Sequence, residues 1–294
     1  MMTGKIIVLG IDALEYTLVE EWDLKYLKQK AYCKVDLSDF DVVITPLIWA
    51  AMLTGKKINE IEKIFLKRAR FFSENPKSVK AKTNQYWIAK IASKILPEKT
   101  KKWIIRNVLP NPFEKTKNIV KDKNYKTIFD FFDKTWTNGI PAYGRNVVDA
   151  TSKKLSILAT EGNPEPLYRY SLETYRKDKR ILLDALKKDY QLIFWYTPFL
   201  DKIEHFYIGK KSKLLNLYLD LNNFIKKIYN TLSSNDILYI VSDHGMIPMN
   251  QTLSGYCGDH SDYGFFSSNT GELIKKPQDL FKIITKKASS SNRI

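Results

Sequence analysis

Three short apolar runs, each bounded by turn residues, constrain the fold of this chain more than any other feature. They read KIIVLG at residues 5–10, QLIFWY at 191–196 and DILYIV at 236–241. Runs of this length and composition predict buried strands, and the amphipathic segments at 166–188 and 214–232 predict helices. Strands that alternate with helices are typical of βαβ units. The expected fold is therefore a three-layer α/β/α fold with a mostly parallel central sheet.

The rest of the core is expected to continue this alternation. Thr45 and Pro46 close a second predicted strand, and Thr54 with Gly55 ends the helix after it. The loop PAYGRN follows another short predicted strand. The further expected elements are a strand at 41–44 (DVVI), a helix at 49–53, a helix at 125–134, a strand at 136–140 and a flexible tail at 286–294.

Residues 56–122 differ in character from what surrounds them. Apolar residues recur there at helical spacing with lysines between them, which predicts a basic helical cap inserted into a core of residues 1–55 and 123–285. Residues 56–126 hold 20 Lys and Arg against 6 Asp and Glu, a balance of +14 in a chain of net charge +16. Such an excess indicates an anionic partner, namely a phosphate ester, a nucleic acid or an acidic membrane. A lysine-rich solvated surface is the alternative.

The composition limits the class of protein. A hydrophobic content of 44% is enough for a packed core and excludes a disordered chain. No apolar run approaches the roughly 20 residues of a transmembrane helix. The run at 6–9 is too short for a signal peptide, so a cytoplasmic location is expected. Cys33 and Cys257 lack metal-binding spacing and are expected to be small packed residues.

Polar side chains follow each predicted strand where it ends. They are Asp12, Thr45, Asp201 and the pair Asp243 and His244, the last two within IVSDHGM at 240–246. Ligands of open α/β sheets bind beyond the carboxyl ends of the strands, so these side chains are expected to meet. The alternative for the Asp-His-Gly stretch is an ordinary turn.

The other histidines of the chain also lie beside aspartates. His205 comes four residues after Asp201 in DKIEH, so the two side chains share one face if the stretch is helical. His260 is in the expected loop GDHSDYG. An Asp–His surface pair explains either motif alone, but the chain has 3 histidines and all of them follow this pattern. Mixed Asp and His ligands suit zinc, and also manganese.

The order of these motifs resembles the alkaline phosphatase superfamily and, within it, the type I phosphodiesterase/nucleotide pyrophosphatase family. The likeness is carried by LGIDA, TPLIWAAMLTG, DKIEH, SDHG and GDHSDYG, and it covers residues 5–55 and about 125–268. It implies an alkaline-phosphatase-like core with two divalent ions, zinc or alternatively manganese. By resemblance, one ion would be surrounded by Asp12, Thr45, Asp243 and His244, and the other by Asp201, His205 and His260.

The resemblance also implies an activity. Thr45 would be a metal-activated nucleophile that forms a phosphothreonine intermediate during hydrolysis of an anionic phosphodiester or pyrophosphate, such as a nucleotide. The PAYGRN loop follows the strand expected at 136–140, so Tyr143, Arg145 and Asn146 are expected to face the same edge of the sheet. The Arg145 guanidinium could hold a phosphate oxygen there. An ordinary arginine of a surface loop is the alternative.

The chain departs from the family pattern at two places. Ala13 stands where a glycine is common, and the basic cap begins where many relatives carry a His-Gly pair after Gly55. The second departure leaves the substrate open.

Other functions remain as alternatives. The same core can serve a phosphomonoesterase, or a phosphotransferase or phosphomutase. The basic cap could instead belong to a nucleic-acid- or membrane-binding protein with a vestigial metal site, although an intact Thr45 argues against such decay. Phosphoglycerate mutases of this superfamily use a serine nucleophile and a large insertion, and neither Cys33 nor Cys257 begins a sulfatase motif.

Overall fold

A computed structural model describes residues 4–40, 43–57, 60–61, 120, 125–144, 150–249 and 256–291. A six-stranded sheet with strand order β2-β8-β5-β1-β4-β3 forms its centre. Strand β1 lies between β4 and β5 and runs parallel to both, and β3 is parallel to β4. Strand β8 alone is reversed, since it is antiparallel to both of its neighbours, β2 and β5. The sheet is therefore mostly parallel, as expected. The strands are β1 (Ile6–Ile11), β2 (Ala31–Asp36), β3 (Thr135–Asn138), β4 (Leu192–Thr197), β5 (Ile237–Ser242) and β8 (Tyr263–Ser268).

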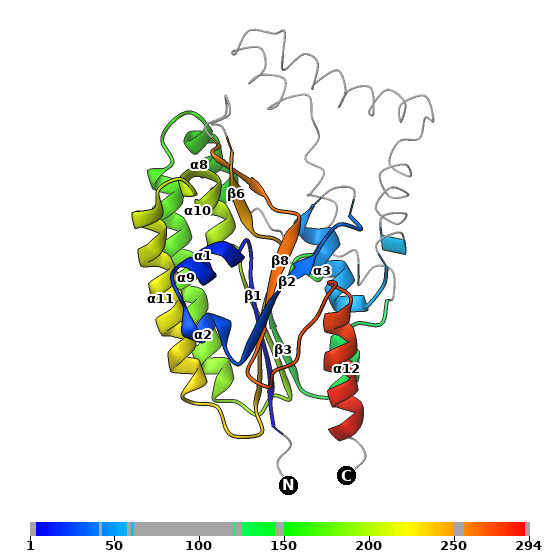
Figure 1. Ribbon diagram of the computed structural model, residues 1–294. Coiled ribbons are helices and arrows are strands. Elements are labelled where there is room, and N and C mark those ends of the chain that lie inside the picture. The colour runs from blue at the N-terminus through cyan, green and yellow to red at the C-terminus, as the bar shows by residue number, and fades with distance from the viewer. Residues whose placement is uncertain are drawn as a thin grey trace, which may run out of the picture.

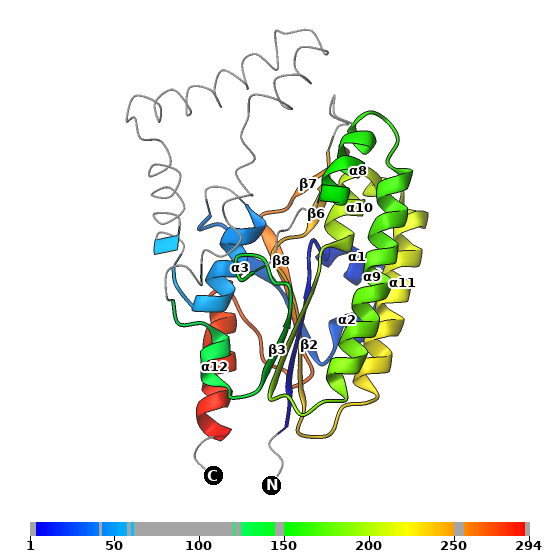
Figure 2. The same ribbon diagram turned by 180° about the vertical axis from the view of Figure 1, so that it is seen from behind.

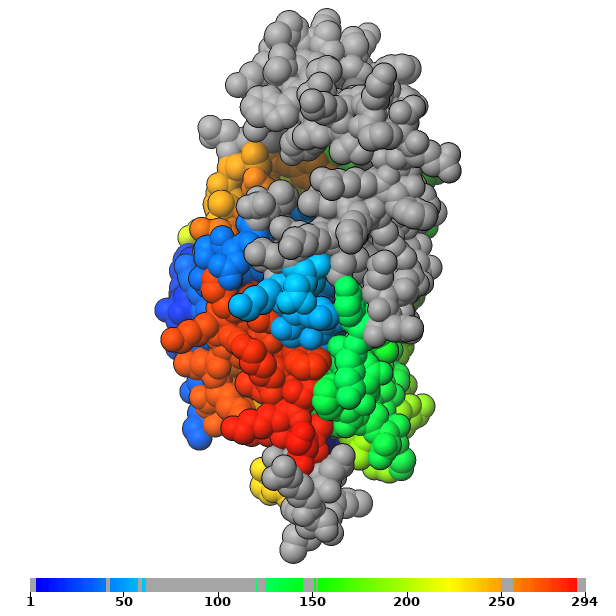
Figure 3. Space-filling view, turned by 90° about the vertical axis from the view of Figure 1, so that its right-hand side faces the viewer, coloured from blue at the N-terminus to red at the C-terminus, as the bar shows by residue number. Residues whose placement is uncertain are grey.

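Helices cover both faces of the sheet, which confirms the three-layer α/β/α prediction (Figures 1 and 2). One face carries α1 (Tyr16–Glu21), α2 (Lys25–Lys28), α8 (Ala150–Thr160), α9 (Glu165–Leu186), α10 (Phe199–Tyr207) and α11 (Lys211–Tyr229). The other carries α3 (Thr45–Thr54), the 3-10 helix η1 (Ile128–Phe131) and α12 (Asp279–Ser291). On this second face α12 (red) lies beside α3 (light blue) and the segment around η1 (green), as Figure 3 shows.

The alternation of side chains along β1 explains why two layers form. Ile7, Leu9 and Ile11 point into the hydrophobic layer beneath α9, α10 and α11, whereas Ile6 and Val8 point into the layer beneath α3 and α12. Each layer removes apolar surface from water, which is the main favourable term in folding. All residues of β1 and β4 are buried, as their continuous apolar sequence requires.

A small second sheet extends the carboxyl edge of the main one. Its strands β6 (Met246–Pro248) and β7 (Gly258–His260) are antiparallel, and both come after β5 in the chain. His260 therefore ends a strand, and its expected position in a loop is wrong. The pairing of Met246 with His260 brings the two chain segments of the SDHG and GDHSDYG motifs together.

Some predicted elements differ from the structure. Val43 and Ile44 are not in a strand, although Ile44 is extended, because the edge position beside β8 is taken by β2. The helix expected at 125–134 is reduced to the single turn η1. Helix α12 continues to Ser291, so most of the expected tail at 286–294 is helical. Nearly all of the expected cap at 56–122, with Arg145 and Asn146, lies outside the described residues.

Within the described ranges, no helix combines the length and the apolar character needed to cross a membrane.

Candidate metal centre

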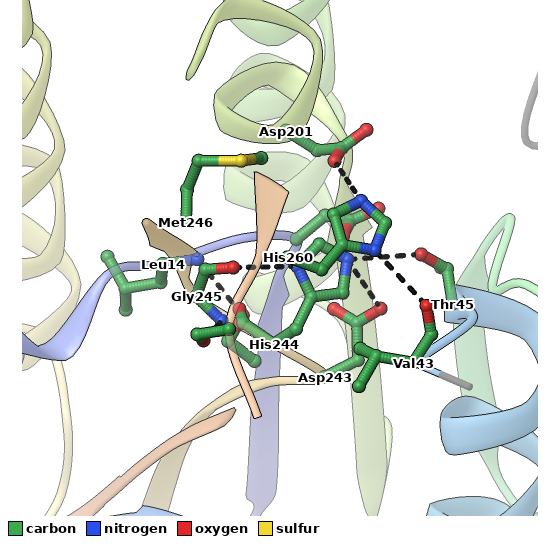
Figure 4. Close-up of polar contacts among 12 residues, drawn as sticks. Leu14, Val43, Thr45, Asp201, Asp243, His244, Gly245, Met246 and His260 are labelled. Atoms are coloured by element: carbon green, nitrogen blue, oxygen red, sulfur yellow. Dashed lines mark hydrogen bonds and ion pairs between the residues drawn. The ribbon is translucent and has the colours of Figure 1, made fainter. Parts of the chain in front are cut away.

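The structure brings the predicted ligands together at the carboxyl edge of the sheet (Figure 4). Asp12 directly follows β1, and Asp243 and His244 directly follow β5. Thr45 is the first residue of α3, and His260 is the last residue of β7. Asp201 and His205 lie on α10, with Asp201 in its first turn. Seven side chains from five elements or their ends are therefore gathered at one place in the structure.

His244 is at the centre of a first, fully buried group. Its Nε2 lies 3.3 Å from Asp12 Oδ1, 3.6 Å from Asp243 Oδ2 and 3.3 Å from Thr45 Oγ1. One ligand atom from each of Asp12, Asp243 and His244 lies within 4.8 Å of the other two. The three side chains have 0% exposure. This spacing is compatible with a single ion held among them.

Asp201 is at the centre of a second, more open group. Its Oδ1 lies 3.3 Å from His205 Nε2 and 3.5 Å from His260 Nε2, and the two Nε2 atoms are 3.3 Å apart. Asp201, His244 and His260 again bring their ligand atoms within 4.8 Å of one another. The side chains of Asp201, His205 and His260 are 20–24% exposed, so this group opens to solvent.

Backbone carbonyls fix the orientation of all three imidazole rings. Nδ1 lies 3.1 Å from Gly258 O in His205, 3.0 Å from Gly245 O in His244 and 3.2 Å from Val43 O in His260. A carbonyl oxygen only accepts, so each Nδ1 must donate its hydrogen, which leaves Nε2 of the neutral ring with its lone pair toward the centre. Metal-binding histidines in proteins are held in this way.

The carboxylates carry oxygens that protein groups do not satisfy. Asp12 Oδ1, Asp201 Oδ1 and both oxygens of Asp243 are buried without a hydrogen-bond partner. Buried polar atoms normally have a partner, and a cluster of orphaned carboxylate oxygens beside imidazole nitrogens fits divalent cations. The arrangement of these oxygen and nitrogen donors therefore fits divalent metal ions.

Burial and mutual repulsion shift the pKa values of the buried group. Burial, with the charges of Asp243 and Asp201, raises the pKa of Asp12 well above its usual value. Burial raises the pKa of Asp243 to about 7, with Asp201 acting in the same direction. Burial, reinforced by the positive charge of His260, lowers the pKa of His244 to about 3.

In the more open group, the pKa values of Asp201 and His260 are shifted in the opposite directions to those of the buried carboxylates and His244. Burial tends to lower the pKa of His260, but the carboxylate of Asp201 outweighs burial and raises it to about 9. Burial likewise opposes ionisation of Asp201, yet His205 and His260 hold its pKa well below the usual value. Cations in place of protons would relieve the repulsion among the three carboxylates.

Comparison with known proteins identifies the family of this chain. A family model described as type I phosphodiesterase / nucleotide pyrophosphatase matches residues 6–262. The chain belongs to the type I phosphodiesterase/nucleotide pyrophosphatase family. It is accordingly a hydrolase of phosphoric esters, and the family resemblance of its motifs is confirmed.

The alkaline phosphatase of the Antarctic bacterium TAB5 is a similar solved structure. It shows 12% identity over 98% of this chain and 99% of that chain, with a TM-score of 0.41. A mutant of the same enzyme with Mg bound shows 13% identity over the same shares, with a TM-score of 0.39. The comparison with curated proteins gave no match.

The side chain of Thr45 does not cap the helix that it begins. Helix α3 begins at Thr45, but the N-cap is Ile44 and no side chain caps the helix. A threonine that precedes a proline can be the N-cap of a helix, but Thr45 does not have this role. Its hydroxyl instead lies beside His244, at 8% exposure.

Glu15 is a buried residue beside the site that supports its structure and that the sequence motifs did not reveal. Its carboxylate accepts hydrogen bonds from Thr17 N at 2.8 Å, Met246 N at 2.9 Å and the Tyr263 hydroxyl at 2.8 Å. A Cβ on Gly245 would lie 2.1 Å from Glu15 Oε2, so the glycine after His244 is required by this close approach. Glu15 therefore joins the Asp12 loop, the His244 turn and β8. No sequence signal distinguished it from other glutamates.

A second buried carboxylate supports α10 beside the ligand His205. Glu204 Oε1 accepts a 2.7 Å hydrogen bond from the Tyr218 hydroxyl of α11, and the same hydroxyl accepts one from Glu15 N at 2.9 Å. Burial raises the pKa of Glu204 well above its usual value. The chain Glu15–Tyr218–Glu204 ties α10 and α11 to the loop after β1.

The structure also describes two further positions that the sequence singled out, Ala13 and Tyr143. Ala13 has φ of 61°, the left-handed region that favours the glycine common in the family. Tyr143 packs its ring on Phe129 with centroids 4.6 Å apart, and burial raises its pKa. Tyr143 thus belongs in part to the layer beneath α3.

Proposed function

We propose that this chain is a two-metal phosphoryl hydrolase in which Thr45 is the nucleophile. The cluster of orphaned, buried carboxylate oxygens beside the Thr45 hydroxyl is the observation that supports it most directly. Asp12, Asp243 and His244 would hold one divalent ion together with Thr45, and Asp201, His205 and His260 would hold the other. Zinc is the preferred ion for this donor set, and manganese is the alternative.

The bound ions would supply Lewis acidity that lowers the pKa of the Thr45 hydroxyl and offsets the charge of the phosphoryl oxygens. Thr45 Oγ1 would attack phosphorus, forming the threonine O–P bond as the bond to the leaving alcohol breaks. Attack by water on the phosphothreonine would restore the hydroxyl and release a phosphomonoester. The amino end of α3, where Thr45 lies, favours an anionic phosphoryl group through its partial positive charge.

The substrate is proposed to be a phosphodiester or pyrophosphate, with a nucleotide as one form. The family supports this class, and the net charge of +16 favours an anionic molecule. Tyr143, Arg145 and Asn146 remain proposed substrate contacts, of which only Tyr143 lies among the described residues.

The test compares hydrolysis of bis-p-nitrophenyl phosphate and p-nitrophenyl phosphate by protein stripped with a chelator and reloaded with zinc or manganese. Thr45→Ala should lower kcat by roughly 10³-fold or more, because it removes the attacking atom. Thr45→Ser should retain part of the activity. Thr54→Ala is the matched control, because Thr54 lies at the other end of α3 and its hydroxyl donates to Ala50 O at 2.6 Å.

The outcomes separate the alternatives. Diester cleavage that survives Thr45→Ala would contradict the nucleophile. A preference for the monoester would indicate a phosphomonoesterase. Metal binding without turnover of either ester would favour a transferase, or a protein that binds nucleic acid or membrane through its basic segment.

A further inference from the structure

Tyr196 is a buried side chain behind the metal centre that the proposed mechanism does not use. It lies on β4, where it pairs with Gly10 of β1, and it has 0% exposure. Its hydroxyl hydrogen-bonds to Asp12 Oδ2. A carboxylate oxygen only accepts, so Tyr196 donates its hydrogen to this oxygen.

The two oxygens of Asp12 therefore have different surroundings. Oδ2 is held by Tyr196, whereas Oδ1 lacks a hydrogen-bond partner and lies 3.3 Å from His244 Nε2. The backbone of Asp12 is fixed as well, because its N–H donates to Thr197 O at 3.0 Å. Asp12 thus presents Oδ1, and not Oδ2, toward the other ligands.

Packing prevents the Tyr196 ring from moving away. The ring contacts Trp49 edge-to-face, with centroids 5.4 Å apart and an interplanar angle of 88°. Trp49 is fully buried and lies one turn after Thr45 on α3. The Tyr196 ring is therefore held between the helix that carries the nucleophile and the strand that carries Asp12.

We propose that Tyr196 is a positioning residue that holds Asp12 as a one-oxygen ligand and so sets the affinity and coordination number of the buried ion. This inference rests on the proposed two-metal centre. Partners that orient a ligand without touching the ion typically change metal affinity by roughly 10- to 100-fold when removed. Without the Tyr196 hydroxyl, Asp12 could rotate and offer both oxygens.

The test measures Zn²⁺ affinity by competition with a chromophoric chelator at fixed pH, and the visible absorption of the Co²⁺-loaded protein. Tyr196→Phe should lower the affinity for one ion by roughly 10- to 100-fold and alter the Co²⁺ spectrum, because the coordination number changes. Tyr239→Phe is the matched control. Tyr239 is a fully buried tyrosine on β5 whose hydroxyl donates to the carboxylate of Glu272, which is not a proposed ligand. This control should retain wild-type affinity and spectrum.

A double-mutant cycle tests whether Tyr196 acts through Asp12. In an Asp12→Ala background, Tyr196→Phe should change the affinity for the remaining ion by no more than about twofold, because the partner has gone. A larger change overturns the inference. Thermal melting of the metal-free variants checks that Tyr196→Phe and Tyr239→Phe are both folded.

The positioning role of Tyr196 and the two-metal centre on which it rests are distinguished by the wild-type protein. If the wild-type protein binds two ions and Tyr196→Phe matches it in affinity and spectrum, the positioning role is overturned and the metal centre stands. If the wild-type protein binds no divalent ion, both are overturned.

Discussion

At the scale of single residues, the buried carboxylate of Glu15 supports the site because its hydrogen-bond partners are all donors. Glu15 accepts from Thr17 N, Met246 N and the Tyr263 hydroxyl, so each of its oxygens already faces a hydrogen. Replacement by glutamine puts an amide NH₂ against these donors. We expect Glu15→Gln to lower the free energy of unfolding by about 1–3 kcal/mol, the usual cost of a buried polar group left without a partner.

Urea unfolding of the metal-free protein measures this effect without interference from bound ions. Glu20→Gln is the control, because Glu20 also accepts from a tyrosine, Tyr32, but its side chain is 41% exposed. That change should cost less than about 0.5 kcal/mol. Equal costs for the two variants would show that Glu15 does not support the His244 turn.

Whether a site residue can be predicted from the sequence depends on whether local structure alone fixes its position. The ligands could be found because Asp12, Asp243 and His244 each follow a strand directly, so the strand alone fixes where they lie. Glu15 could not be found, since its role depends on the position of Met246, 231 residues later in the chain. Tyr196 ends a recognisable strand, but only the register of β4 against β1 brings it beside Asp12.

At the scale of elements, the contact between α3 and β1 positions Thr45, the proposed nucleophile. A Cβ on Gly10 would lie 2.7 Å from Trp49 Cη2 and 3.3 Å from Phe194 Cε1. Trp49 cannot yield easily, because it is fully buried against Phe194 and Tyr196. We expect Gly10→Ala to lower the free energy of unfolding by about 1–3 kcal/mol through overpacking.

The displaced helix carries Thr45, so Gly10→Ala should also lower kcat by roughly one to two orders of magnitude. Gly209→Ala is the control, because a Cβ there meets nothing within 4 Å. Chemical denaturation and diester hydrolysis measure the two effects. Loss of stability with unchanged kcat would mean that α3 does not transmit the strain to Thr45.

Elements differ in how far sequence determines them. The strands β1, β4 and β5 were predicted to within one residue, because they are buried on both faces and read as continuous apolar runs. The edge strand β2 (AYCKVD) is mostly half-buried or exposed and has no such run, so its pairing with β8 was missed. The DVVI segment has strand composition, but composition does not supply a neighbouring strand to pair with.

At the scale of the whole molecule, a strongly basic chain contains a cluster of buried carboxylates. The net charge is +16, so an anionic ester should be attracted over distances longer than a hydrogen bond. We expect KM for the diester to rise with ionic strength while kcat stays constant, because salt screens the attraction but not the buried centre. Steady-state kinetics in increasing KCl, with sucrose as the uncharged control, measure this. A salt-independent KM would contradict it.

The same centre makes metal binding a competition with protons. Burial holds the pKa of Asp243 at about 7, and Asp201 raises that of His260, despite its burial, to about 9. Both groups must lose a proton to become ligands, so each bound proton opposes the ion. Between pH 7 and 9 the metal-free protein still carries the proton of His260, and below pH 7 it also carries that of Asp243.

Zinc affinity should therefore rise with pH, most steeply below pH 7 and less steeply up to pH 9. Each proton released contributes roughly tenfold per pH unit. Chelator competition at several pH values, corrected for protonation of the chelator, measures the slope, and His260→Gln should reduce it by the one proton assigned to His260. An affinity that does not change across this range would mean that these two groups are not ligands. The unpartnered oxygens of the buried carboxylates would then have no bound cation that accounts for them.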